Sequence, residues 1–171
     1  RTGPAGDLLQ RVPRAAIYGH RAVVEWLHEE QSVPLTDEVL LTAGGMLLAT
    51  SQLPIHCAAL SGQLAVVQWM CERGVPLYIA NPEGEQPIHK AAEGGHLAVM
   101  QWLCDRGVSL TALTSEDLQP IHLAAICGHL AVVEWLHKHA VPLAAATGEG
   151  WQPIHEAAWS GHLALVQWLH K

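Results

Sequence analysis

The sequence has few basic residues. Lysine and arginine together number 9 against 16 acidic residues, which gives the chain of 171 residues a net charge of −7. Proteins that bind DNA or RNA hold the phosphates mainly with lysine and arginine, so this balance argues against a nucleic acid as the main partner. A neutral or basic protein partner fits the charge better.

The sequence also lacks long apolar runs. None approaches the roughly 18 residues needed to span a bilayer, and no charged-then-apolar leader precedes a small-residue cleavage site. We therefore expect a soluble protein without a membrane span. Because the first residue is Arg1 rather than methionine, we expect a processed form or an excerpt of a longer protein, whose other domains could carry the function.

Motifs for catalysis are absent as well. The sequence contains no nucleophile motif, no phosphate-binding glycine loop and no paired-carboxylate pattern. Residues 148–151, GEGW, include two glycines but no lysine or threonine follows them, so they give only a weak signal. We assign no catalytic residue and no cofactor, and we predict that the chain is not an enzyme.

What the sequence does contain is a repeat of 33 residues. Residues 86–103 read QPIHKAAEGGHLAVMQWL and residues 119–136 read QPIHLAAICGHLAVVEWL, and the units that begin there share 18 of 33 residues. Each unit predicts a short helix opened by proline, a turn at glycine, a second helix and an extended connection. The second helix is apolar around most of its circumference, so neighbouring units must stack to bury it.

The pattern PIHxAAxxGHLAVVxWL, followed by a GVPL-type segment, resembles the ankyrin repeat. The resemblance covers nearly the whole chain and implies an all-α solenoid of stacked helix-turn-helix pairs with projecting β-hairpin loops. We expect a single domain, 1–171, made of a degenerate cap at about 1–35, an inserted segment at 36–52, and units at 53–85, 86–118, 119–151 and 152–171, the last truncated. The first helices are expected near Pro13–Tyr18, Pro54–Ser61, Pro87–Gly94, Pro120–Cys127 and Pro153–Ser160.

Three departures from the family pattern stand out. Glutamine, or Leu53 in one unit, replaces the threonine before proline, and this loses about 1 kcal/mol of helix capping per unit unless other contacts recover it. In the first unit, Pro13 stands where the signature histidine should be. The spacing from Trp26 to Trp69 exceeds the period by ten residues. For this insertion we expect a packed extension of the hairpin, or a helical turn around 37–41; an inserted contact site is the functional alternative.

The recurring histidines and tryptophans are interpreted as architecture. Equivalent positions in stacked helices lie roughly 8 to 10 Å apart, too far for one zinc ion with ligands at about 2 Å, so we predict no metal site. In the ankyrin pattern these imidazoles hydrogen-bond backbone groups of the adjoining loop, and the indoles pack in the core. The structural residues are His56, His89, His122 and His155, with Trp69, Trp102, Trp135 and Trp168.

Cysteine spacing favours thiols over disulfides. Cys71 and Cys104 occupy equivalent places one repeat apart, farther than the 7 Å between Cα atoms that a disulfide allows. Without a CxxC motif or a leader, the cysteines indicate a reducing, intracellular setting. We expect the cytoplasm, with the nucleus not excluded.

The resemblance implies that a partner binds the concave face formed by the hairpin tips and first helices. Trp151 and Trp159 are our first choices, because the other units do not have aromatic residues at these positions. Apolar residues gather in the last units while acids line the tips, so we expect a partner with apolar anchors and basic residues, bound by a monomer. The remaining candidates are Lys90, Glu93, Leu123, Ile126, Glu156, Glu83, Glu85, Glu116, Asp117, Leu118 and Glu149.

Three functional hypotheses follow from the sequence. The first is a non-catalytic protein-protein interaction scaffold, and the second is a spacer or intramolecular docking region of a larger multidomain protein. The third is an enzyme or metal protein built on the histidine and cysteine content, which the spacing argument disfavours. Ordinary variable surface, or contact with a further unit, is the alternative reading of the candidate binding residues.

Overall fold

The computed structural model describes residues 4–30, 32, 33, 35 and 53–171, with the backbone alone for residues 4–10. These residues form ten helices and no strand, and none of the helices is long and apolar enough to cross a membrane. The helices are α1 (Pro4–Ile17), α2 (Arg21–Glu29), α3 (Pro54–Leu60), α4 (Leu64–Glu72), α5 (Pro87–Glu93), α6 (Leu97–Cys104), α7 (Pro120–Ile126), α8 (Leu130–Lys138), α9 (Pro153–Trp159) and α10 (Leu163–Leu169).

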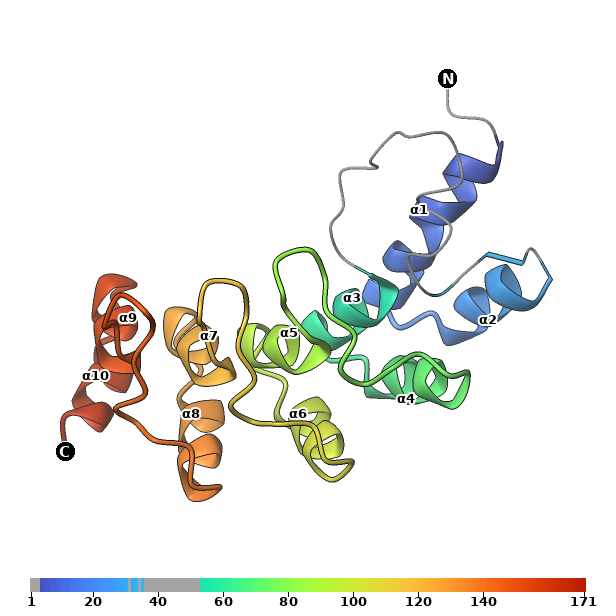
Figure 1. Ribbon diagram of the computed structural model, residues 1–171. Coiled ribbons are helices and arrows are strands. Elements are labelled where there is room, and N and C mark those ends of the chain that lie inside the picture. The colour runs from blue at the N-terminus through green and yellow to red at the C-terminus, as the bar shows by residue number, and fades with distance from the viewer. Residues whose placement is uncertain (1–3, 31, 34, 36–52) are drawn as a thin grey trace.

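The helices form consecutive antiparallel pairs that stack in one row (Figure 1). The first helices of the pairs, α1, α3, α5, α7 and α9, pack against one another in series, and each contacts its own second helix. The loops before α5, α7 and α9 project beyond the first helices (Figure 1). The predicted all-α solenoid of stacked helix pairs is therefore confirmed.

Proline opens the first helices α3, α5, α7 and α9, and in the last three of these a histidine binds the residue before the proline. In α5, Pro87 is the first helical residue, where its missing N–H loses no helical hydrogen bond. Gln86 precedes it in an extended conformation, and its backbone N–H donates to Nδ1 of His89 at 3.0 Å. The same bond joins Gln119 to His122 and Gln152 to His155. Histidine thus satisfies a backbone donor at the helix start and recovers part of the capping that threonine would supply.

The other nitrogen of these imidazoles binds the following loop. Because Nδ1 accepts a hydrogen bond, Nε2 carries the proton and donates to a carbonyl: His89 to Ala112 at 2.9 Å and His122 to Ala145 at 3.0 Å. His56 donates similarly to the carbonyl of Glu85 at 2.8 Å. Burial lowers the pKa of all three rings by more than these bonds raise it. The imidazoles therefore stay neutral and serve as cross-links.

A second set of histidines connects neighbouring pairs. His129, at the start of α8, donates from Nε2 to the carbonyl of Glu93, the last residue of α5, at 2.8 Å. His162 makes the equivalent bond to Ile126 of α7, also at 2.8 Å. Both bonds therefore reach back from one helix pair to the preceding pair. They fix the distance from one pair to the next.

Glycine makes room for these rings. Gly95 has φ +74°, and a Cβ added there would lie 2.6 Å from Nδ1 of His129. Gly128 repeats the arrangement with His162, at 2.5 Å. A side chain at either position would thus meet both backbone strain and the neighbouring imidazole.

The tryptophan column packs less deeply than the repeat suggests. Trp69 is 2% exposed, whereas Trp102, Trp135 and Trp168 are partly buried at the margin of the core. Arg106 covers the ring of Trp102, with its guanidinium carbon 3.7 Å from the ring centroid. Full burial is therefore correct only for Trp69, because the second helices pack loosely against each other and their outer faces meet solvent.

The projecting loops are held by short-range hydrogen bonds. In the loop before α7, Thr114 N–H donates to the carbonyl of Leu118, and in the loop before α9, Thr147 N–H donates to that of Trp151. Neighbouring loops are also joined, since Ser115 donates from its N–H and its hydroxyl to the carbonyl of Glu83. The loops are therefore hairpin-like turns, and the described residues contain no β-strand.

The first pair departs from the sequence prediction. Its first helix begins at Pro4 rather than Pro13, and Pro13 lies inside α1. Helix α1 thus begins with proline, as the later first helices do. Pro13 within the helix removes only one helical hydrogen bond. The helical turn expected around 37–41, and the rest of the inserted segment 36–52, lie outside the described residues.

We expect the stability of the fold to decrease as the pH falls from 7.5 to 5.5. The buried His56, His89 and His122 have pKa values below the ordinary 6.5, so the unfolded chain takes up protons first and is favoured as the pH falls through that value. Each pH unit in this window lowers stability by up to about 1.4 kcal/mol per histidine. Urea unfolding followed by circular dichroism at pH 7.5, 6.5 and 5.5 measures the effect. A midpoint that stays constant or rises on acidification would contradict the assignment.

We expect Gly95→Ala to destabilise the protein more than Gly107→Ala does. Both glycines have positive φ, +74° and +84°, but a Cβ at position 107 meets nothing within 4 Å. The control thus carries only backbone strain, about 1 kcal/mol, while Gly95→Ala also displaces His129 and its bond to the preceding pair. Thermal unfolding compares the two variants. Equal shifts in midpoint would show that the imidazole contact contributes nothing.

Candidate binding groove between α7 and α9

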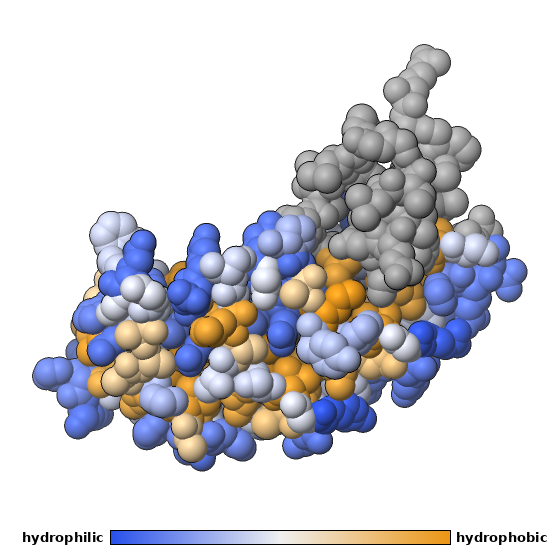
Figure 2. All heavy atoms as spheres, in the orientation of Figure 1, coloured by the Kyte–Doolittle hydropathy of each residue, from blue (hydrophilic) through white to orange (hydrophobic). Residues whose placement is uncertain are grey.

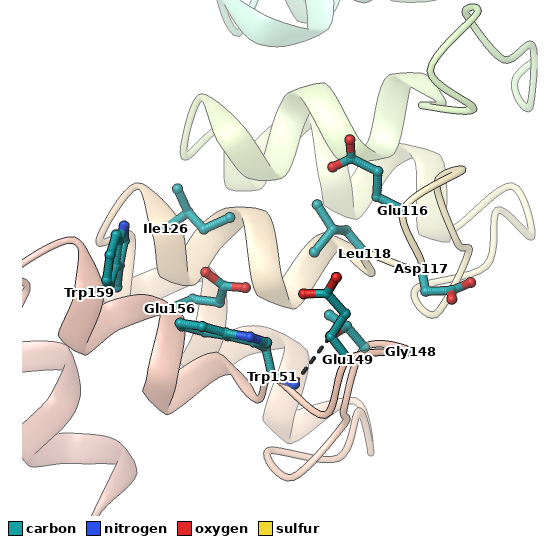
Figure 3. Close-up of a pocket in the computed structure, with 10 residues that line it drawn as sticks. Glu116, Asp117, Leu118, Ile126, Gly148, Glu149, Trp151, Glu156 and Trp159 are labelled. Atoms are coloured by element: carbon teal, nitrogen blue, oxygen red, sulfur yellow. Dashed lines mark hydrogen bonds between the residues drawn. The ribbon is translucent and has the colours of Figure 1, made fainter.

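An open pocket of about 830 Å³ lies between the first helices α7 and α9 and the loops that precede them (Figure 3). We call it the α7–α9 groove. The loop before α7 and the loop before α9 form one end, while Ile126 of α7 and Glu156 and Trp159 of α9 form the other. Its lining residues are Glu116, Asp117, Leu118, Ile126, Thr147, Gly148, Glu149, Trp151, Glu156 and Trp159.

Two tryptophans form the aromatic part of the groove. Trp151 directly precedes the N-cap residue of α9, and Trp159 is the last residue of that helix. Their ring centroids are 6.1 Å apart and the planes meet at 89°. Trp159 is 82% exposed and Trp151 37% exposed, although both rings are large and apolar. Packing within the chain therefore leaves much of this aromatic surface available.

The backbone around Trp151 is held firmly. Thr147 receives the N–H of Trp151 at its Oγ1, 3.1 Å away, and donates its own N–H to the carbonyl of Trp151 at 2.9 Å. The ring of Trp151 also meets His155 edge to face, with centroids 6.2 Å apart. A hydrogen-bonded turn thus positions this indole before any partner binds.

Carboxylates surround the aromatic part. Four of the ten lining residues are acidic, namely Glu116, Asp117, Glu149 and Glu156, and none is basic. Within the described part of the chain, the ion pairs involve other carboxylates. In the space-filling view, the tips of the loops are mostly hydrophilic and apolar surface lies between them (Figure 2). The groove therefore combines apolar walls with a negative rim.

Eight residues selected from the sequence meet in this groove. They are Glu116, Asp117, Leu118, Ile126, Glu149, Trp151, Glu156 and Trp159. The repeat brings them together, because equivalent positions of successive units become neighbours when the units stack. Gly148 also lines the groove and was not selected. Its position next to Glu149 in the same loop was the sequence feature that could have identified it. In the structure Gly148 lies close to the neighbouring loop, because a Cβ at Gly148 would lie 2.7 Å from Oδ2 of Asp117.

Lys90 lies elsewhere and has its own partners. Its ammonium is 2.7 Å from Oε2 of Glu85 and 2.8 Å from Oε2 of Glu93, and its side chain is only 6% exposed. Burial alone would lower the pKa of Lys90, but hydrogen bonds to both carboxylates outweigh it and raise the pKa. Burial would raise the pKa of Glu85, yet the bonds from Lys90 and Asn81 lower it. This network stabilises the third helix pair from within.

Two further selected residues do not line the groove. Leu123 is only 8% exposed on α7 and faces the protein interior. Glu83 is exposed, and its carbonyl receives Ser115 of the next loop. Both remain candidates from the sequence alone, and neither belongs to the α7–α9 groove.

The histidines and cysteines form no cluster that could hold a metal among the described residues. Cys71, Cys104 and Cys127 are free thiols, and burial raises the pKa of Cys71 to about 11. A thiol with so high a pKa is a poor nucleophile at neutral pH.

Comparison with known proteins agrees with this architecture. Among curated proteins, none matches the chain. A model of ankyrin repeats in three copies matches residues 14–114, and a model of ankyrin repeats in many copies matches residues 121–170. Ankyrin repeats generally bind other proteins and are typically non-catalytic. The chain belongs to the ankyrin repeat family.

Proposed function

We propose that this protein is a non-catalytic interaction scaffold that binds a segment of another protein in the α7–α9 groove. The observation that carries the proposal is the exposed pair of Trp151 and Trp159 inside an acidic pocket of about 830 Å³. The helix pairs repeat the residues that build the fold, but these two tryptophans have no aromatic counterpart in the other units. They therefore have no evident purpose in stacking the pairs.

The groove favours a partner of particular chemistry. Trp151, Trp159, Ile126 and Leu118 offer apolar contact area, and buried aromatic residues often dominate the energy of an interface. The acidic rim and the net charge of −7 attract basic residues and repel acidic ones. We infer that the partner presents an apolar anchor flanked by lysine or arginine.

We expect the double variant Trp151→Ala, Trp159→Ala to weaken partner binding at least about tenfold, a loss of 1.4 kcal/mol or more. Its helical circular dichroism should be unchanged, because both rings are exposed. The partner is first isolated by affinity capture and mass spectrometry and then measured by titration calorimetry. Tyr78→Ala is the matched control, since Tyr78 is 72% exposed and lies outside the groove. Unchanged affinity in the double variant would refute the groove assignment.

A second candidate function is docking within a larger polypeptide. The observation that favours it is the exposed side of the last helix pair. Ile121 and Ala125 of α7 are completely buried, whereas their counterpart Ile154 of α9 is partly buried and Ala158 is exposed. Leu163 of α10 is 67% exposed. This surface has the composition of a stacking face, so another helix pair or domain would cover it.

We expect a chain extended by a copy of residues 139–171 after Lys171, which adds a connecting loop and a helix pair in register, to unfold at a higher temperature. The added pair would cover Ile154, Ala158 and Leu163 and bury apolar area worth roughly 25 cal/mol per Å². An equally long Gly/Ser extension serves as the control. If both extensions leave the thermal midpoint unchanged, the exposed side is not a stacking face.

A further inference from the structure

The two indoles of the α7–α9 groove form a corner. Figure 3 views both rings nearly edge-on, with Trp159 upright and Trp151 flat, and the carboxylate of Glu156 lies on the inner side of the corner above Trp151. The angle of 89° between the planes turns two aromatic faces toward the same space. Glu156 and Trp159, three residues apart on α9, share one side of the helix.

Arginine side chains cover the rings of two other tryptophans, Trp69 and Trp102. Arg73 lies over Trp69, with its guanidinium carbon 5.2 Å from the ring centroid, and Arg106 lies over Trp102 at 3.7 Å. In both cases the arginine follows the tryptophan by four residues, at or just after the end of the helix that carries the ring. Trp159 is the last residue of α9, and the residue four after it is Leu163 of α10; within the described residues, the arginine–indole contacts involve Trp69 and Trp102 instead.

The charge of the groove further distinguishes Trp151 and Trp159 from the tryptophans that arginine covers. Its ten lining residues include four carboxylates and no lysine or arginine. A cation over an aromatic face gains from the ring's negative quadrupole, and a carboxylate beside the ring adds a charge-assisted hydrogen bond. The corner thus contains both attractive elements of a cation site and lacks the cation.

We propose that the corner formed by Trp151, Trp159 and Glu156 binds the guanidinium of an arginine side chain of the partner. The inference rests on the proposed function and specifies which partner residue enters the groove. Guanidinium is flat and weakly hydrated, so it stacks on one indole while its N–H edge faces Glu156. The ammonium of lysine is compact and strongly hydrated, and it lacks the flat face. Leu118 and Ile126 then receive apolar neighbours of the arginine.

The first test uses N-acetyl-arginine methylamide as the probe and the indole N–H signals of the intact chain in ¹H–¹⁵N NMR. We expect the signals of Trp151 and Trp159 to shift with saturation in the millimolar range, while the signal of Trp102, already covered by Arg106, stays constant. Trp159→Ala should abolish the shift at Trp151, and Glu156→Gln should weaken binding about fivefold. The corresponding lysine and norleucine derivatives should bind more weakly, by about threefold or more.

Absence of any shift at Trp151 and Trp159 would overturn the inference, as would equal shifts with the norleucine derivative. Tighter binding of the lysine or an N-methylated lysine derivative would overturn it in favour of another cation. Tyr78→Ala is the control for non-specific loss, since Tyr78 lies outside the groove.

A second test separates this inference from the proposed function. Once the captured partner's binding segment is synthesised, each arginine is replaced by citrulline, which keeps the shape and removes the charge. We expect one replacement to weaken binding about fivefold or more, and Glu156→Gln to remove most of that difference. If affinity depends on Trp151 and Trp159 but on no arginine, the proposed function stands and the arginine site does not. If affinity depends on neither tryptophan, both fail.

Discussion

Imidazole hydrogen bonds to backbone groups are the interaction on which the rest of the structure depends. The signature histidines His89 and His122 each join the start of their helix to the following loop, as His89 does through Gln86 and Ala112. The turn histidines His129 and His162 each join their pair to the preceding one, as His129 does through Glu93. Hydrophobic burial drives the pairs together without direction, so these directional bonds set how far apart and at what angle they stack.

This division of labour explains where a binding site can form. The residues that recur every 33 positions are occupied in building the stack, and changing them disturbs the fold. Residues on the loops and on the exposed sides of the first helices are not needed for stacking, so their side chains vary from unit to unit. In the last two pairs these positions hold indoles, carboxylates and aliphatic groups, and stacking brings them into one groove. The scaffold therefore positions a surface that it does not require for its own stability.

Much of the fold could be predicted because the same residue pattern recurs every 33 residues, so each unit supports the interpretation of the others. The repeat predicted four helix pairs, and proline at the first helical position located their first helices to within one residue. The cap was less accessible, since its sequence departs from the pattern and α1 begins at Pro4 instead of Pro13. The partial exposure of Trp102 could not be predicted from the sequence either, because the repeat pattern does not show how closely the second helices approach each other.

The groove was partly predictable for the same reason. Trp151 and Trp159 stood out because they interrupt the repeat, and stacking placed them beside Glu116 and Leu118 from the preceding unit. The burial of Lys90 between Glu85 and Glu93 could not be read from spacing, since the sequence does not show that two carboxylates converge on one ammonium. The electrostatic environment and the exposure of a side chain depend on its neighbours in three dimensions, and only the folded structure shows these neighbours.

The most direct test of the central claim is the protonation state of the signature histidines, measured by long-range ¹H–¹⁵N NMR of the imidazole nitrogens. The structure requires His89 and His122 to be neutral with the proton on Nε2, hydrogen-bonded at both nitrogens, and to stay neutral below the ordinary pKa of 6.5. Rings that carry the proton on Nδ1, titrate as exposed imidazoles do, or change on addition of zinc would contradict their role as cross-links.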